Sequence, residues 1–147
     1  MEAIIRLENL FFRYDDVEAI CDVSLTLPAG IFGLLDPNGA GKTTLMKLLL
    51  GFLRPAAGAG EVMGQPLGTR GRALRRAVGY MPESDCLVPG MDAVSLTAYL
   101  GELSGMPRQE AMKRAHDVLY YVGLEESRYR QVETYSTGMK QRIKLAQ

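Results

Sequence analysis

The stretch Leu34-Leu35-Asp36-Pro37-Asn38-Gly39-Ala40-Gly41-Lys42-Thr43-Thr44 lies between an apolar run and a helical pattern. Its two glycines let backbone amides approach an anion without side-chain clash, at the point where a helix begins. We predict a phosphate-binding cradle in which Lys42 reaches the terminal phosphates and the Thr43 hydroxyl completes a magnesium site. The residues expected to hold a nucleotide here are Asn38, Gly39, Ala40, Gly41, Lys42, Thr43 and Thr44.

One position departs from the general pattern of such loops, G-x-x-x-x-G-K-[ST]. Asp36 stands where the first glycine is expected. Aspartate tolerates unusual backbone angles, so the conformational penalty should be modest. Its charge matters more, because at roughly 8 Å from a phosphate it costs about 2 kcal/mol at an effective dielectric of ~20. We expect weakened rather than abolished binding; the alternative is a glycine-rich turn that binds nothing.

Composition narrows the class of protein. Seventeen acidic and seventeen basic side chains cancel over 147 residues, so no net charge favours nucleic acid or an anionic membrane. No apolar run approaches the roughly eighteen residues of a membrane helix, and no signal-peptide pattern opens the chain. A soluble, cytosolic protein is expected. Cys21 and Cys86 match no metal-ligand spacing and are expected to be reduced and partly buried.

The first half of the chain predicts strands around the loop. Residues 4–12 and 23–27 alternate apolar and polar positions, as strands with one solvated face do. Residues 31–35 are continuously apolar, which predicts a central parallel strand. Short strands are also expected around 61–63 and over 77–81. The helix after the loop should carry an apolar face made of Leu45, Leu48, Leu49 and Phe52.

The second half predicts helices. Apolar periodicity indicates helices over 91–103 and 107–122, with Gly123 at the stop position of the latter. A basic helix follows from residue 139, opened by Ser136-Thr137-Gly138. Before these helices lies a cluster of arginines, which we interpret as a solvated helix face rather than a nucleic-acid patch: Arg70, Arg72, Arg75 and Arg76.

Taken in order, these features resemble the ATP-binding domain of ABC transporters over essentially the whole chain. The loop is similar to the family's Walker A motif. The resemblance places Tyr14, in Phe12-Arg13-Tyr14, where the family has an aromatic residue that stacks on adenine. Gly79-Tyr80-Met81-Pro82-Glu83 is similar to the segment entering the Q-loop, with Glu83 in place of the usual glutamine. The resemblance implies that the Glu83 side chain contacts magnesium and the attacking water. A carboxylate is a suitable ligand for magnesium.

A fourth motif, Tyr135-Ser136-Thr137-Gly138-Met139-Lys140-Gln141-Arg142, resembles the family signature LSGGQ with its basic extension. A helix N-terminus is a natural anion site. The resemblance implies that this one grips the γ-phosphate of ATP held by a second ATP-binding domain. Met139 replaces the motif's glutamine, a variant that, with Glu83, favours an exporter-type subunit. The residues assigned to this contact are Ser136, Thr137, Gly138 and Met139.

The resemblance implies an α/β fold: a P-loop NTPase core with an incomplete parallel sheet over 1–82, an α-helical subdomain over 83–138, and the start of the signature helix over 139–147. It also implies ATP and Mg²⁺ as ligands and a head-to-tail dimer of two ATP-binding domains. A membrane-spanning transporter subunit would be the other partner, which places the protein peripherally on the cytoplasmic face of the membrane.

In the family the Walker B strand, with its catalytic glutamate, follows the signature helix, beyond Gln147. No catalytic set is therefore complete in this chain, and we expect an incomplete domain without ATP turnover of its own. Strand neighbours of 31–35 would also be missing, which predicts marginal folding. His116 has no acidic or metal-ligand partner in pattern, and we expect no functional role for it.

The sequence is also compatible with two other classes of function. A non-hydrolysing binding module, contributing only signature contacts, is favoured by Asp36 and by the lack of Walker B. A P-loop kinase would also need Lys42 and Thr43. Kinase chemistry does not explain the segment 135–142.

Overall fold

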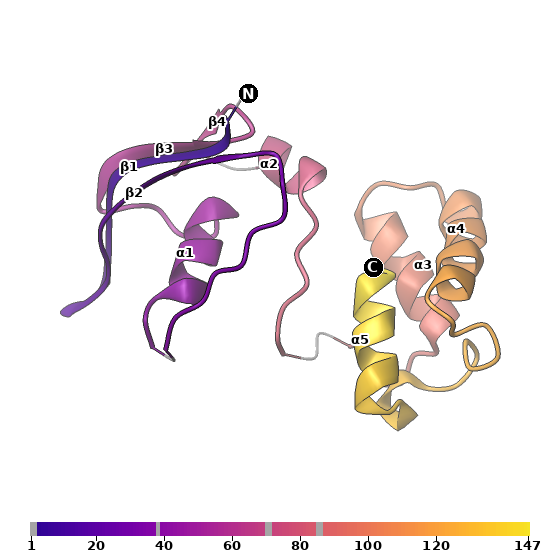
Figure 1. Ribbon diagram of the computed structural model, residues 1–147. Helices are drawn as coiled ribbons and strands as arrows, with labels where there is room; N and C mark the ends of the chain where they lie inside the picture. The colour runs from indigo at the N-terminus through magenta and orange to yellow at the C-terminus, as the bar shows by residue number, and fades with distance from the viewer. Residues whose placement is uncertain (1–2, 38, 70–71, 85–86) are drawn as a thin grey trace. The chain divides into compact units, whose positions relative to one another are not determined.

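The computed structural model describes residues 3–37, 39–69, 72–84 and 87–147. The chain divides into two compact units, Met1–Gly79 and Tyr80–Gln147. Each is built around its own cluster of buried apolar side chains. The first unit contains a sheet with a helix against it, and the second contains helices (Figure 1).

The sheet of the first unit has the strand order β2-β1-β3-β4. Its strands are β1 (Ala3–Tyr14), β2 (Val17–Pro28), β3 (Ala57–Val62) and β4 (Gln65–Pro66). β1 and β2 confirm the two alternating strands, and β3 confirms a strand near 61–63 that begins earlier than expected. All pairings among the described residues are antiparallel.

An irregularity in β1 places two leucines in the same core. Leu7 and Leu10 are both fully buried, although residues three apart in a regular strand point to opposite faces. The register shifts between them, and Asn9 has a φ of 46°. Such a bulge inserts one extra residue into the strand, so that the side chains of Leu7 and Leu10 point to the same face of the sheet. Leu7 and Leu10 then pack with Ile20 of β2 and with Leu45 and Leu48.

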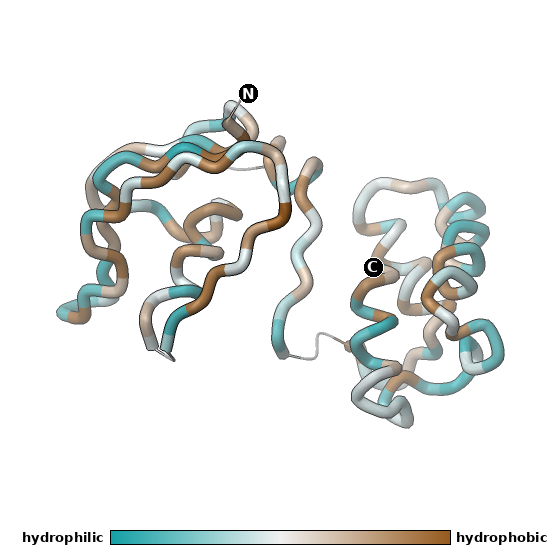
Figure 2. Tube along the Cα trace, in the orientation of Figure 1, coloured by the Kyte–Doolittle hydropathy of each residue, from teal (hydrophilic) through white to brown (hydrophobic). Residues whose placement is uncertain are grey.

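The predicted central parallel strand at 31–35 is not formed. These residues have irregular backbone, and Ile31 and Leu35 are 103% and 92% exposed. Figure 2 colours parts of this segment brown, as apolar chain outside the sheet. Apolar composition does not make a strand by itself, because a strand needs a neighbour that takes up its N–H and C=O groups. Residues 77–81 lack strand structure for the same reason, with Tyr80 and Met81 exposed.

Helix α1 (Lys42–Leu49) follows the glycine-rich loop as predicted, and it packs Leu45 and Leu48 against the sheet. Leu49 is half-buried, but Phe52 lies beyond the helix and is exposed, so the expected apolar face is one residue too long. The Arg75 guanidinium lies 6.0 Å from the centre of the Phe52 ring. Arg75 and Arg76 of α2 (Arg72–Ala77) are exposed, whereas Arg70 falls outside the described residues.

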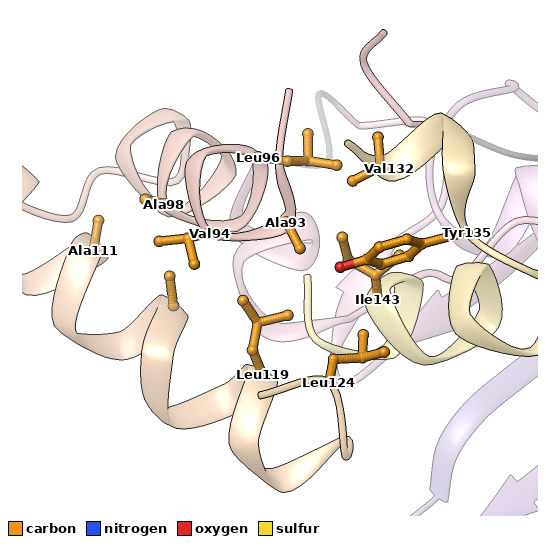
Figure 3. Close-up of a cluster of buried hydrophobic side chains, with 11 residues drawn as sticks. Ala93, Val94, Leu96, Ala98, Ala111, Leu119, Leu124, Val132, Tyr135 and Ile143 are labelled. Carbon is orange, nitrogen blue, oxygen red and sulfur yellow. The ribbon is translucent and has the colours of Figure 1, made fainter. Parts of the chain in front are cut away.

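The second unit contains α3 (Ala93–Leu103), α4 (Arg108–Tyr121), the 3₁₀ turn η1 (Val132–Thr134) and α5 (Thr137–Leu145). These confirm the predicted helices, and their apolar faces meet in one core (Figure 3). The core side chains from the four elements and their connections are Ala93, Val94, Leu96, Ala98, Ala111, Ala115, Leu119, Leu124, Val132, Tyr135 and Ile143.

Local hydrogen bonds explain where these helices begin and end. The Asp92 side chain accepts from the Ser95 amide at 2.8 Å and caps α3. Gly123, at φ 68°, donates to the Tyr120 carbonyl, and the next amide donates to Leu119. These two bonds form a Schellman motif, which needs a left-handed residue and therefore favours glycine. The predicted stop at Gly123 is confirmed.

Side chains with metal or thiol chemistry are dispersed. The described His, Cys, Asp and Glu residues form no group of three or more that could hold a metal ion. Cys21 is exposed rather than partly buried, and its thiol lies 3.5 Å from a Glu18 carboxylate oxygen. The pKa of the thiol is raised, mainly by desolvation and to a smaller extent by the Glu18 carboxylate. Cys86 lies outside the described residues. His116 contacts the Tyr129 ring edgewise at 6.2 Å.

Candidate functional site

The glycine-rich loop turns into α1 through two left-handed residues. Gly39 and Gly41 both have a φ of 89°, which side chains strongly disfavour. Between them, the Ala40 amide donates to the Pro37 carbonyl at 3.3 Å. Gly41 is the N-cap of α1, and a Cβ there would overlap the Ala19 carbonyl oxygen of β2. The loop can therefore pack this closely against β2 only because residue 41 is a glycine.

The first turn of α1 follows directly from Gly41. The amides of Lys42, Thr43 and Thr44 belong to this turn, whose N–H groups have no partner within the helix. They carry the positive end of the helix dipole, which attracts phosphate oxygens. The backbone at 39–44 places these amides at the start of α1, while Asn38 lies outside the described residues. Their role in holding a phosphate stays a prediction.

Lys42 lies across this loop. Its Nζ donates to the Asp36 carbonyl at 2.6 Å and to the Pro37 carbonyl at 2.7 Å. An ammonium has three donors, so two loop carbonyls leave it able to bind a further acceptor. The contact also places the Asp36 main chain beside the cation, while the Asp36 residue is exposed.

The two threonines after Lys42 differ in environment. Thr43 is exposed, whereas Thr44 is buried. Only an accessible hydroxyl can take a solvent-side ligand, so the structure favours Thr43 over Thr44 for the predicted magnesium contact. Mg²⁺ is usually held by one or two protein groups together with phosphate oxygens and water, and a single threonine hydroxyl fits that pattern.

Tyr14 is the last residue of β1 and is exposed. Its ring meets Phe12 edge to face, with centroids 4.8 Å apart and planes at 84°. An exposed ring is available for stacking, but its adenine role stays a prediction. Tyr14 and the loop both belong to the first unit, whereas Glu83 and the segment 135–142 belong to the second. The shared magnesium site of Thr43 and Glu83 is therefore also a prediction.

In the second unit the segment 136–139 opens α5. Ser136 is the N-cap, and its Oγ accepts from the Met139 amide at 3.4 Å. Thr137 and Gly138 are exposed on the first turn. Met139 is half-buried and packs against the core, so this part of the motif offers its backbone rather than its side chain to a ligand. The predicted helix start is confirmed, and the phosphate contact stays a prediction.

Tyr135 fixes the approach to this turn. Its ring is buried in the core of the second unit, and its hydroxyl donates to the Ser127 carbonyl at 2.7 Å. Burial raises the pKa of Tyr135, so the hydroxyl stays protonated and keeps donating at neutral pH. The aromatic residue in place of the motif's leucine is thus both an apolar anchor and a hydrogen-bond donor.

Sequence reasoning missed two anchors of α5. Arg142 Nη1 donates to the Gly123 carbonyl at 2.8 Å, at the end of α4. Lys144 Nζ donates to the carbonyls of Pro82 and Glu83 at 3.1 and 3.2 Å, while Glu83 itself is exposed. In the sequence both cations belong to an evenly basic helix, and no local pattern separates them from solvated ones.

Replacing Ser136 with alanine should destabilise the second unit by about 1 kcal/mol, the usual cost of losing an N-cap oxygen. The effect should appear as a lower midpoint in urea unfolding followed by circular dichroism. Thr137→Ala, one position into the helix, removes a similar hydroxyl that makes no cap and is the control. Equal midpoints for the two variants would contradict the assigned cap.

A family model described as ABC transporter matches residues 20–147. The chain belongs to the ABC transporter family. The matched range includes the glycine-rich loop, the segment before Glu83 and residues 135–142, and the chain is part of a nucleotide-binding domain of that family.

Individual relatives agree with this assignment. An uncharacterized ABC transporter ATP-binding protein of Nostoc sp. is 41% identical over 143 residues, covering 93% of this chain and 41% of that protein. Nod factor export ATP-binding protein I of Burkholderia lata is 37% identical over 145 residues, covering 98% of this chain and 48% of that protein. The chain therefore spans less than half the length of these curated relatives.

A solved structure supports the fold. CbiO1 from Clostridium perfringens, part of the ABC transporter complex cbiONQ, aligns with a TM-score of 0.84 at 24% identity. The alignment covers 99% of this chain and 61% of that one. It confirms the predicted fold class, an α/β P-loop NTPase with a helical part. In the described residues of this ABC chain, no helix has both the length and the apolar character needed to cross a bilayer.

Proposed function

We propose that this chain is the nucleotide-binding part of an ABC exporter subunit, and that it binds MgATP at residues 38–44. The observation that carries the proposal is the loop itself, in which left-handed Gly41, packed on the Ala19 carbonyl, opens α1 beside Lys42. Amides at a helix N-terminus, together with a nearby ammonium, can bind a triphosphate through charge-assisted hydrogen bonds.

Each ligand group has a candidate partner in this proposal. Lys42 binds the terminal phosphates, Thr43 and Glu83 contribute to magnesium, and Tyr14 stacks on adenine. Bound magnesium supplies charge neutralisation of the phosphate oxygens. The chain's own contribution is to position the triphosphate against the first turn of α1 and to keep its charge paired.

The partners follow from the same proposal. Residues 136–139 contact ATP held by a second ATP-binding domain arranged head to tail, and a membrane-spanning subunit carries the substrate. The protein then lies on the cytoplasmic face of the membrane. Export is supported by the name of the Nod factor export relative and by the variant residues Glu83 and Met139.

A second candidate is a nucleotide-binding module that does not hydrolyse ATP. Asp36, which brings a negative charge to the loop, favours it. A coupled ATPase assay on the full-length protein separates the two, because ordinary turnover excludes the module. The 147-residue chain alone should show no turnover in this assay, since positioning by Lys42 and charge neutralisation by magnesium leave out a group that orients the attacking water.

Replacing Asp36 with glycine should tighten MgATP binding by about tenfold or more, because removing the carboxylate removes roughly 2 kcal/mol of repulsion before screening. Calorimetric titration at low salt measures this directly. Asp36→Asn keeps the size of the side chain and removes the charge, so it should give most of the same gain. An unchanged or weaker affinity in both variants would contradict the electrostatic account.

A further inference from the structure

Lys144 makes an unusual set of contacts for a lysine of a basic helix. Its residue is only 5% exposed, although lysines are almost never buried without partners. The Nζ donates to two consecutive main-chain carbonyls, those of Pro82 and Glu83, at 3.1 and 3.2 Å. A desolvated ammonium is tolerated only when such acceptors surround it, so the two carbonyls and the lysine hold each other in place.

The neighbours of Lys144 anchor α5 on other sides. Ile143 is completely buried in the core shared with α3 and α4. Arg142 donates to the Gly123 carbonyl, which places a cation at the C-terminal end of α4. Three consecutive residues thus connect α5 to the core, to the end of α4 and to the segment at 82–83. Both cations lie in the last turn of α5, where the helix dipole favours positive charge.

We propose that Lys144 is a positioning residue that clamps the Glu83 segment onto α5, so that Glu83 and the signature turn at Ser136 move as one rigid piece. The inference rests on the proposed function, in which Glu83 and residues 136–139 serve two different nucleotides. Lys144 lies eight positions after Ser136, a rise of about 12 Å along the helix. A displacement at the signature turn is then carried by α5 to the carbonyl of Glu83.

The clamp is tested by proteolysis of the full-length protein with a glutamate-specific protease. Glu83 is exposed, so its accessibility to cleavage depends on how firmly the segment is held. Lys144→Met keeps the length of the side chain without its donors. It should speed cleavage after Glu83 by about tenfold, because hydrogen bonds to a charged group are lost. Cleavage after Glu126, an exposed turn residue of the same unit, is the internal reference and should not change.

Two outcomes of this experiment overturn the clamp. One is an unchanged rate of cleavage after Glu83. The other is an equal increase after Glu83 and Glu126, which would mean general loosening of the unit. Lys144→Arg retains cationic donors and should restore slow cleavage. If the methionine variant does not fold, Lys144→Gln, which keeps two N–H donors but loses the charge, should give about a threefold increase.

The link to turnover is tested with the same variants. In the full-length protein Lys144→Met should lower kcat for ATP by about tenfold and change KM less than twofold, since Glu83 would act after ATP binds. Lys144→Arg should recover kcat, and Lys113→Met, an exposed lysine of α4, should have no effect. Faster cleavage with unchanged kcat would overturn the proposal. If the unaltered full-length protein does not turn over ATP, the second candidate function, a module that does not hydrolyse ATP, holds instead, and the cleavage rates alone decide the clamp.

Discussion

Replacing Lys42 with methionine should lower the affinity for MgATP by about a hundredfold. In the structure the Lys42 ammonium lies across the glycine-rich loop, bonded to the carbonyls of Asp36 and Pro37. Hydrogen bonds to charged groups contribute about 1.5–3 kcal/mol each, and each 1.4 kcal/mol is about tenfold in affinity. Methionine fills similar space but offers phosphate no donor. Titration with a fluorescent ATP analogue in the presence of magnesium measures the loss.

Lys47→Met is the matched control for this experiment. Lys47 is an exposed residue in the last turn of the same helix, away from the N-terminal amides. Its replacement removes one positive charge from α1 without touching the loop, so affinity should change less than about threefold by long-range electrostatics. If both variants lose affinity equally, general charge rather than a specific phosphate contact would explain the effect.

Replacing Gly41 with alanine should cost about 3 kcal/mol of stability or more in the first unit, and it should also abolish nucleotide binding. Alanine at a φ of 89° costs roughly 1 kcal/mol from the backbone alone. The added Cβ would also overlap the Ala19 carbonyl oxygen and crowd Ile20, so β2 and the loop must separate. Overpacking of this kind typically adds about 1–3 kcal/mol.

Gly39→Ala is the comparison that isolates the clash. Gly39 has the same φ of 89°, but a Cβ there meets nothing within 4 Å. Both variants carry similar backbone strain, so the difference between their unfolding free energies in urea measures the contact with β2. Gly41→Ala should be the less stable by about 2 kcal/mol. Equal stabilities would mean that the loop does not pack on β2 at Gly41.

The parts of the fold that local chemistry determines were predictable from sequence. Apolar periodicity and caps within one helix define α3, α4 and α5, so their positions were correct to within a few residues. The start of α1 directly after the glycine-rich loop followed from the loop pattern in the same way. Residues 31–35 were not predictable, because strand formation there depends on neighbours distant in sequence rather than on their own apolar character.

In the candidate site, too, features set by neighbouring residues were predictable, and features that depend on distant residues were not. Residues within four positions of the N-caps Gly41 and Ser136 indicate where α1 and α5 begin. The anchors at Arg142 and Lys144 are not, since their acceptors lie 19 and 61–62 residues away. The bulge that buries both Leu7 and Leu10 was equally hidden, because it depends on pairing between β1 and β2.

The most direct test of the account is a crystal structure of the protein with a magnesium-bound, non-hydrolysable ATP analogue. We expect the triphosphate to accept hydrogen bonds of about 2.7–3.2 Å from the amides of Gly41 to Thr44. The Lys42 ammonium should bind its terminal phosphates, and Thr43 should contact the metal. A ligand bound elsewhere at saturation, with the amides of Gly41 to Thr44 making no phosphate contact, would contradict the account.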